Sequence, residues 1–119
     1  MSFWIFSRTV KLDAWESKRI IRSLRVGNKR VFRQILIGAG LLPGWWGKIA
    51  SAVLGLSALQ LEAWADRIQK ALRRSPVLGT NVRIGLKPRI GHPPFKAGLE
   101  ASPRRDYKSV PPLSPRPPR

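Results

Sequence analysis

The stretch Gln34–Leu61, QILIGAGLLPGWWGKIASAVLGLSALQL, carries only the charge of Lys48 in a chain whose formal net charge is +17. A transmembrane helix needs about 20 apolar residues, and this stretch exceeds that length. However, Pro43-Gly44 interrupts it, because proline lacks a backbone donor and glycine frees the backbone. The uncharged run after Lys48 has the length of a core helix rather than of a span. The stretch therefore predicts a membrane-associated segment, a soluble helical hairpin or a segment buried in a larger assembly.

The apolar side chains of this stretch are candidates for membrane anchoring, and Trp45 and Trp46 beside Lys48 are typical of interfacial anchors. Basic residues flank both ends, which favours a re-entrant hairpin or helices lying in the interface over a single span. The anchoring candidates are Ile35, Leu36, Ile37, Leu41, Leu42, Trp45, Trp46, Ile49, Val53, Leu54 and Leu56. Small residues at Gly47, Ser51 and Gly55 share one helical face, which predicts self-association through close helix packing and membrane permeabilisation.

After Pro43-Gly44 the apolar residues keep helical spacing as far as Leu72, and Ser75-Pro76 ends the pattern. This predicts one long amphipathic helix of up to about 29 residues, or a helical hairpin with its turn at Pro43-Gly44. The region 34–74 is thus expected to be helical.

The region 1–33 is basic and predicts a short amphipathic helix. Asp13 and Glu16 have the spacing of a capping box, and Gly27-Asn28 is a plausible helix end followed by a restart. The candidate cations for anionic lipid or phosphate are Lys18, Arg19, Arg22, Arg25, Lys29, Arg30 and Arg33. No acidic residue separates them, so they favour a polyanionic partner over a merely solvated face.

The region 75–119 holds every proline except Pro43 and predicts an extended or disordered tail. A brief strand at residues 82–86 is expected to stop at the prolines that follow. Ser102, Pro103, Arg104 and Arg105 resemble the SPRR element of basic chromatin tails, whose arginines enter a minor groove. Pro112–Pro115 has the PxxP spacing that a partner protein with an aromatic groove can bind.

Composition argues against catalysis. The chain has no cysteine, and its one histidine, His92, has no clustered acidic or thiol partners for a base or a metal site. We therefore expect no enzyme, no metal and no cofactor. The N-terminus lacks the order of a secretory signal, and its basic character leaves a mitochondrial presequence open. An intracellular, membrane-associated location is expected.

These patterns together predict a mainly α-helical protein with a disordered Pro/Arg-rich tail. The first functional hypothesis is a non-enzymatic membrane-associated accessory protein, of the kind that small viral genes encode, with the flanking cations on anionic headgroups. The alternative is a basic nucleic-acid-binding or ribonucleoprotein-assembly protein that binds through phosphate. Lys plus Arg number 23 against 6 Asp plus Glu, and this excess fits either partner.

Overall fold

The computed structural model describes residues 4–91 and 94–105. In chain order, the elements of this part are β1 (Phe6–Leu12), α1 (Ala14–Arg25), α2 (Lys29–Gly38), α3 (Pro43–Leu54), α4 (Ala58–Arg74), β2 (Thr80–Pro88) and β3 (Phe95–Pro103). The strands form one antiparallel sheet in the order β1-β2-β3, so the central strand comes late in the sequence. The described chain is an α/β fold.

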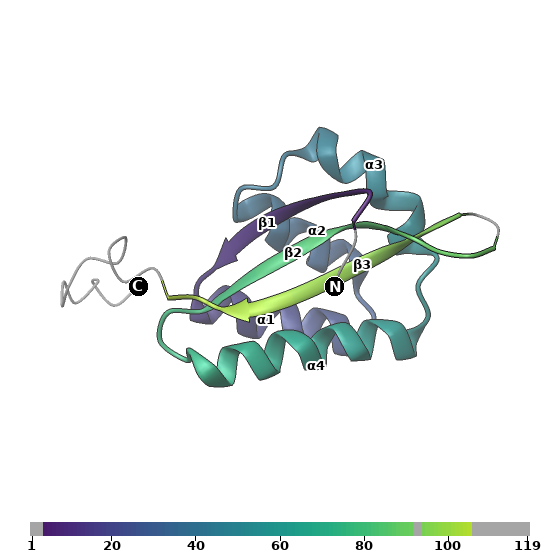
Figure 1. The fold of residues 1–119 in the computed structure, drawn as a ribbon. Helices are drawn as coiled ribbons and strands as arrows, with labels where there is room; N and C mark the ends of the chain where they lie inside the picture. Colours follow the sequence, from purple (N-terminus) through teal and green to yellow (C-terminus); the bar gives the residue numbers. More distant parts are fainter. Residues whose placement is uncertain (1–3, 92–93, 106–119) are drawn as a thin grey trace.

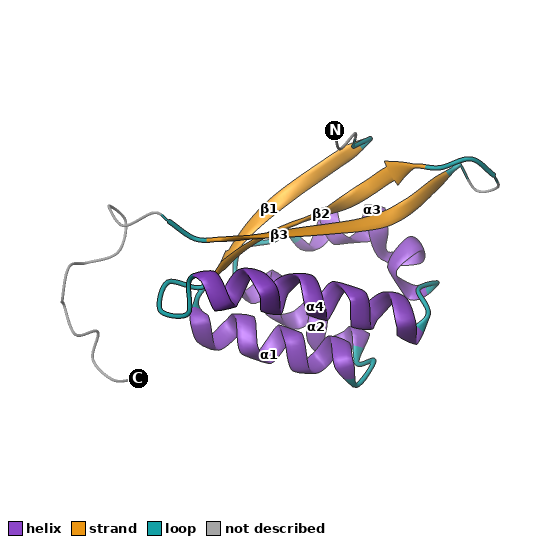
Figure 2. Cartoon of the chain, turned by 60° about the horizontal axis from the view of Figure 1, so that its bottom comes forward, coloured by secondary structure: helices purple, strands orange, loops and turns teal. Residues whose placement is uncertain are grey.

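The helices cover one face of the sheet and leave the other face open within the described residues (Figures 1 and 2). Strand side chains alternate between the two faces. Val10, Leu12, Val82, Ile84 and Leu99 point toward the helices and are buried. The opposite face is polar and basic, which is the usual pattern of an antiparallel sheet with one solvated side.

The prediction of a mainly α-helical protein, with a disordered tail from residue 75 onward, is therefore wrong for the described residues. Residues 106–119 of the predicted tail lie outside the described part. β1 lies ahead of the predicted N-terminal helix, in a segment that shows only weak alternation at Val10 and Leu12. β2 and β3 form a hairpin within the predicted tail, and Pro88 and Pro103 lie at strand ends, where they remove no central ladder bond. Apolar residues at alternate positions of β2 and β3 are buried against the helices. The high proline content of this region favoured a tail and concealed that pattern.

The boundaries of α1 follow the expected signals. The backbone N–H of Glu16 donates to Asp13 Oδ1 at 2.7 Å, and that of Asp13 donates to Glu16 Oε1 at 3.0 Å, which confirms the capping box. The helix ends at Arg25, and Gly27 takes a positive φ of 73°. Asn28 then caps α2, so the chain stops and restarts where the sequence predicts.

The expected long helix is instead two helices. α3 starts at Pro43, a favoured first position, and ends at Leu54. Ser57 and Gln60 form a second capping box that starts α4, which then ends at Arg74 just before Ser75-Pro76. This Ser-x-x-Gln sequence lies within the apolar stretch. It starts a new helix at a point where one continuous helix was expected.

An aromatic cluster joins three of the helices. Phe32 of α2 is fully buried, with its ring centroid 6.0 Å from that of Trp46 in α3 and 5.9 Å from that of Trp64 in α4. A buried hydrogen bond of 2.8 Å between the hydroxyls of Ser17 and Thr80 links α1 to β2. Among the described residues, no helix combines the length and apolar character that crossing a bilayer requires.

Gly79 allows the α4–β2 connection to cross close over the end of β1. Its φ is +102°, and a Cβ there would lie 2.0 Å from the carbonyl oxygen of Leu12. We expect Gly79→Ala to lower the free energy of unfolding by more than the roughly 1–3 kcal/mol of backbone strain alone.

Gly40→Ala is the matched control, because Gly40 has a φ of +118° but a Cβ there meets nothing within 4 Å. Urea unfolding of both variants measures the difference. Equal reductions in the two variants would show that the close crossing at Leu12 has no energetic consequence.

Candidate functional site

The acidic residues of the described chain are already engaged. Asp13 and Glu16 cap α1. Arg25 binds Glu62 and Asp66 at 3.0 Å each, and also Gln69, so this guanidinium joins α1 to α4. These interactions leave little negative charge to offset the remaining cations.

Two of the predicted phosphate-binding cations have structural roles. Arg25 forms the network with the acids of α4. Lys29 Nζ donates to the carbonyl oxygens of Leu54 at 2.7 Å and Leu56 at 3.0 Å. It thereby supplies a hydrogen-bond donor to backbone carbonyls at the C-terminal end of α3, which lack partners within the helix. Neither side chain is therefore free to bind an external anion without breaking internal hydrogen bonds.

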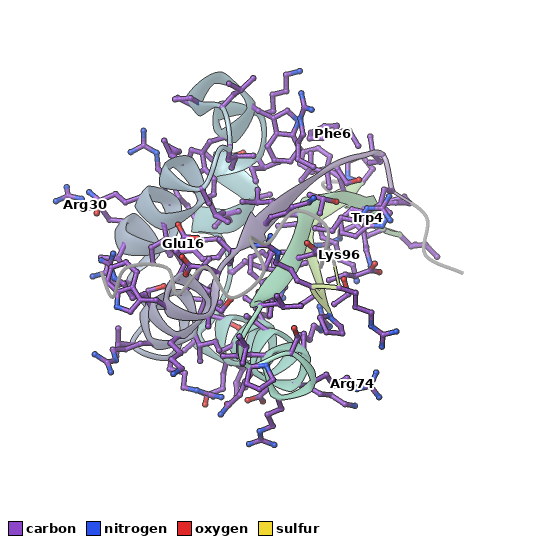
Figure 3. All side chains as sticks on the ribbon, turned by 90° about the vertical axis from the view of Figure 1, so that its left-hand side faces the viewer. Trp4, Phe6, Glu16, Arg30, Arg74 and Lys96 are labelled. Atoms are coloured by element: carbon purple, nitrogen blue, oxygen red, sulfur yellow. The ribbon has the colours of Figure 1, made fainter. Side chains whose placement is uncertain are left out.

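The other predicted cations form a surface that we call the helical basic face. It consists of Lys18, Arg19 and Arg22 on α1 and Arg30 and Arg33 on α2, all exposed. None of them makes an ion pair with any residue that the structure describes. Arg30 points away from the sheet on the side of the helices (Figure 3), and α1 lies on the side of the helical layer far from the sheet (Figure 2).

One aromatic side chain accompanies these cations. Trp15 is 64% exposed, and the guanidinium carbon of Arg19 lies 4.8 Å from the centroid of its ring. A cation–π interaction of this kind keeps the indole on the surface beside the charge. Trp15 is the one large aromatic that is exposed in the described part of the chain.

Most of the predicted membrane-anchoring side chains lie inside the protein. Ile37 and Leu56 are half-buried, and Leu42 and Leu54 are exposed. The buried members are Ile35, Leu36, Leu41, Trp45, Trp46, Ile49 and Val53. Membrane insertion of the buried set would require the helices to leave the sheet.

The predicted association row, Gly47, Ser51 and Gly55, is exposed on α3. The row therefore faces solvent, and helix association through it stays a prediction. Two residues of the tail motif, Ser102 and Pro103, instead end β3.

The last residues of the tail motif follow the strand. The backbone N–H of Arg104 donates to Gly79 O at 3.1 Å, and its carbonyl accepts from Ser75 Oγ at 2.9 Å, while Arg105 is exposed. His92 and the PxxP segment lie outside the described residues. Within the described residues, no three His, Cys, Asp or Glu side chains gather to hold a metal ion.

The open face of the sheet carries a network that sequence analysis missed. Arg83 donates through Nε to Ser7 Oγ at 2.8 Å, and its guanidinium carbon lies 4.6 Å from the ring of Trp4. Lys87 Nζ lies 4.6 Å from the same ring and 3.2 Å from Glu100 Oε2. Trp4 lies on the side of the sheet opposite Arg30 (Figure 3). The alternation of polar and apolar residues over 81–87 is the sequence signal that could have placed Arg83 and Lys87 on this face.

Sequence analysis also missed a groove between the helices and β3. Its largest described hollow, about 400 Å³, lies between α4 and the end of β3 and is lined by Arg67, Lys70, Arg74 and Glu100. A second and a third hollow, of about 150 Å³ and about 360 Å³, continue it toward Phe95. No local sequence pattern could place α4 beside β3, because β3 lies in a proline-rich region for which the sequence predicts a tail.

No protein-family model, curated protein or solved structure matches this chain. The charge and shape of its surfaces therefore carry the functional argument.

Lys29 and Arg30 are neighbours with opposite expected roles. Lys29→Met keeps the aliphatic stem but removes the donor at the end of α3, so we expect a decrease of about 1 kcal/mol in unfolding free energy. The affinity of the Lys29→Met variant for inorganic polyphosphate, a simple polyanionic probe, should stay unchanged. Arg30→Met should show the reverse, with normal stability and weaker polyphosphate binding.

Thermal unfolding and polyphosphate titration of the two variants provide the measurements. If Lys29→Met weakened polyphosphate binding as much as Arg30→Met, the assignment of Lys29 to an internal role would be wrong.

Proposed function

We propose that this protein binds nucleic acid by holding its phosphates on the helical basic face. The observation that carries the proposal is the charge distribution: Lys18, Arg22, Arg30 and Arg33 form no ion pair within the described chain, although other cations do. Duplex and single-stranded nucleic acids have the dense negative charge that such a face attracts.

The chemistry of the face favours phosphate binding over base recognition. Guanidinium and ammonium groups donate hydrogen bonds to phosphate oxygens without selecting a sequence. Stacking on bases needs exposed aromatic rings, and Trp15 is the one exposed ring beside these cations. We therefore expect steep salt dependence and little preference among sequences.

Nucleic-acid binding is favoured over membrane anchoring because most of the apolar stretch lies in the protein core. Its buried side chains build the core that supports the sheet, and Phe32, Trp46 and Trp64 meet there. The protein therefore needs no bilayer to remove these side chains from water. The exposed cations of the helical basic face remain available to an anionic partner, since no described acid pairs with them.

Charge reversal on the helical basic face tests the proposal. The double variant Arg22→Glu/Arg30→Glu should bind a short DNA duplex at least about tenfold more weakly. The slope of log K against log salt concentration should fall in magnitude by about 0.9 for each phosphate that the variant no longer neutralises. Fluorescence anisotropy over a series of salt concentrations measures both quantities.

The double variant Lys48→Glu/Arg73→Glu is the matched control. Both residues are exposed, and the change in net charge is the same, but they lie on α3 and α4. Equal weakening in the two double variants would mean that net charge alone attracts DNA, and it would overturn the assignment to the helical basic face.

A second function is favoured by the exposure of Trp15. An indole beside Arg19 and Lys18 on an amphipathic helix is typical of side chains that enter the interface of an anionic membrane. Such docking would be peripheral and would leave the core intact. The alternative partner is thus an anionic lipid surface that competes for the same cations.

Trp15→Ala separates the two functions. If the protein docks on lipid, the variant should bind vesicles containing phosphatidylserine about tenfold more weakly, because it lacks the interfacial anchor. Duplex binding should change little, since phosphate interactions dominate it. Vesicle flotation and duplex titration of the same preparation give the comparison, and unchanged flotation would remove the case for lipid docking.

A further inference from the structure

β3 is an edge strand of the sheet, and the groove described above runs along it. In the described chain no strand pairs with the side of β3 that faces away from β2. β3 lies next to α4 in two different views (Figures 1 and 2). The hollow nearest Phe95 and the middle hollow have four lining residues in common: Leu56, Gln60, Lys96 and Ala97. The middle hollow and the largest one are both lined by Arg67, so the three form one groove.

The backbone of β3 presents hydrogen-bonding groups to this groove. Arg67 Nη1 donates to the carbonyl oxygen of Leu99 at 2.8 Å, so the peptide groups of Leu99 face away from β2. In an antiparallel ladder, every second residue shares that direction, which gives Ala97 and Ala101 the same orientation. The edge therefore presents N–H and C=O groups at Ala97 and Ala101, on either side of the Leu99 carbonyl that Arg67 occupies.

Small residues form part of the strand side of the groove. Ala97, Gly98 and Ala101 of β3 line it. A Cβ on Gly98 would lie 3.0 Å from the stem of Lys87, so the lysine lies flat across this position. Small side chains let an extended backbone approach the edge closely. Trp64, which also borders the groove, is buried in the core, so it offers nucleobases little ring surface for stacking.

The walls of the groove are basic. Arg67, Lys70 and Arg74 follow one side of α4 at successive turns, and Lys96 stands on the strand. Glu100 is the acidic residue of this lining, and Lys87 holds its carboxylate at 3.2 Å. An occupant with carboxylates on alternate residues would meet the cations of α4, because alternate side chains of a strand share one face. Lys96 alternates with Ala97, so it would face the side chains between those carboxylates.

We propose that this groove binds an extended acidic segment of a partner protein as a fourth strand beside β3. Backbone hydrogen bonds to Ala97 and Ala101 would supply affinity, and the cations of α4 would select acidic side chains. The chain's own residues beyond Arg105 are a poor occupant, because Lys108, Arg116 and Arg119 outnumber Asp106. The site is separate from the helical basic face.

A synthetic peptide of nine residues, the length of β3, tests the proposal. Its sequence alternates Glu with Val or Thr, and a second peptide with Lys in place of Glu is the charge-reversed control. We expect the acidic peptide to bind and the basic one not to bind. Binding should also slow hydrogen exchange at the amides of Ala97 and Ala101, which NMR measures residue by residue.

Two kinds of variant separate the contributions of charge and backbone. Lys70→Glu/Arg74→Glu should weaken binding of the acidic peptide by about tenfold or more, while Arg22→Glu/Arg30→Glu should leave it unchanged. Ala101→Pro removes one outward N–H of the edge and should also weaken binding. Thermal unfolding checks each variant, and the charge variants keep the test decisive if Ala101→Pro does not fold.

Three outcomes would overturn the proposal. If the acidic peptide does not bind, an acidic extended segment is not the ligand of the groove. Binding without slower exchange at Ala97 and Ala101 shows charge attraction without a fourth strand. Competition by single-stranded DNA, together with abolished DNA binding in Lys70→Glu/Arg74→Glu, would assign the groove to nucleic acid. None of these outcomes depends on whether the helical basic face binds duplex.

Discussion

The packing of Phe32 against Trp46 and Trp64 is the interaction on which the rest of the structure depends. It joins α2, α3 and α4 around one fully buried ring and places the apolar stretch beneath the sheet. Aromatic pairs with offset or edge geometry contribute beyond their buried area, so this cluster also restricts how the helices can turn. With the cluster formed, the outer sides of α1 and α2 are left to polar and basic residues.

The sequence predicted the helices far better than the sheet. Helix signals are local: Asp13 with Glu16, Gly27 with Asn28, and Ser75 with Pro76 each lie within one turn of a boundary. Strand signals are weak until the partner is known, because β1 and β3 gain their burial from helices distant in sequence. The alternation in β2 predicted only a brief strand within a tail, because Pro88 follows it, and Pro88 in fact ends a full strand.

The same difference between local and distant information applies to the candidate sites. The helical basic face could be predicted because helical spacing alone groups its cations. The internal roles of Arg25 and Lys29 could not, because their partners are Glu62, Asp66 and carbonyl groups at the end of α3. The groove beside β3 needs both the strand and α4 in place, so no local pattern marks it.

The position of the central strand has a consequence for how the protein is made. Among the described strands, β1 pairs with β2 alone, and the register joins Phe6 to Leu86, which are far apart in the sequence. Ribosomes add about 5–20 residues per second, so β1 waits several seconds before its partner is synthesised. The four helices can pack on one another during that interval, because all of them precede β2 in the chain. We therefore expect the sheet to close over a helical layer already present, with the non-local β1–β2 pairing as the slow step of folding.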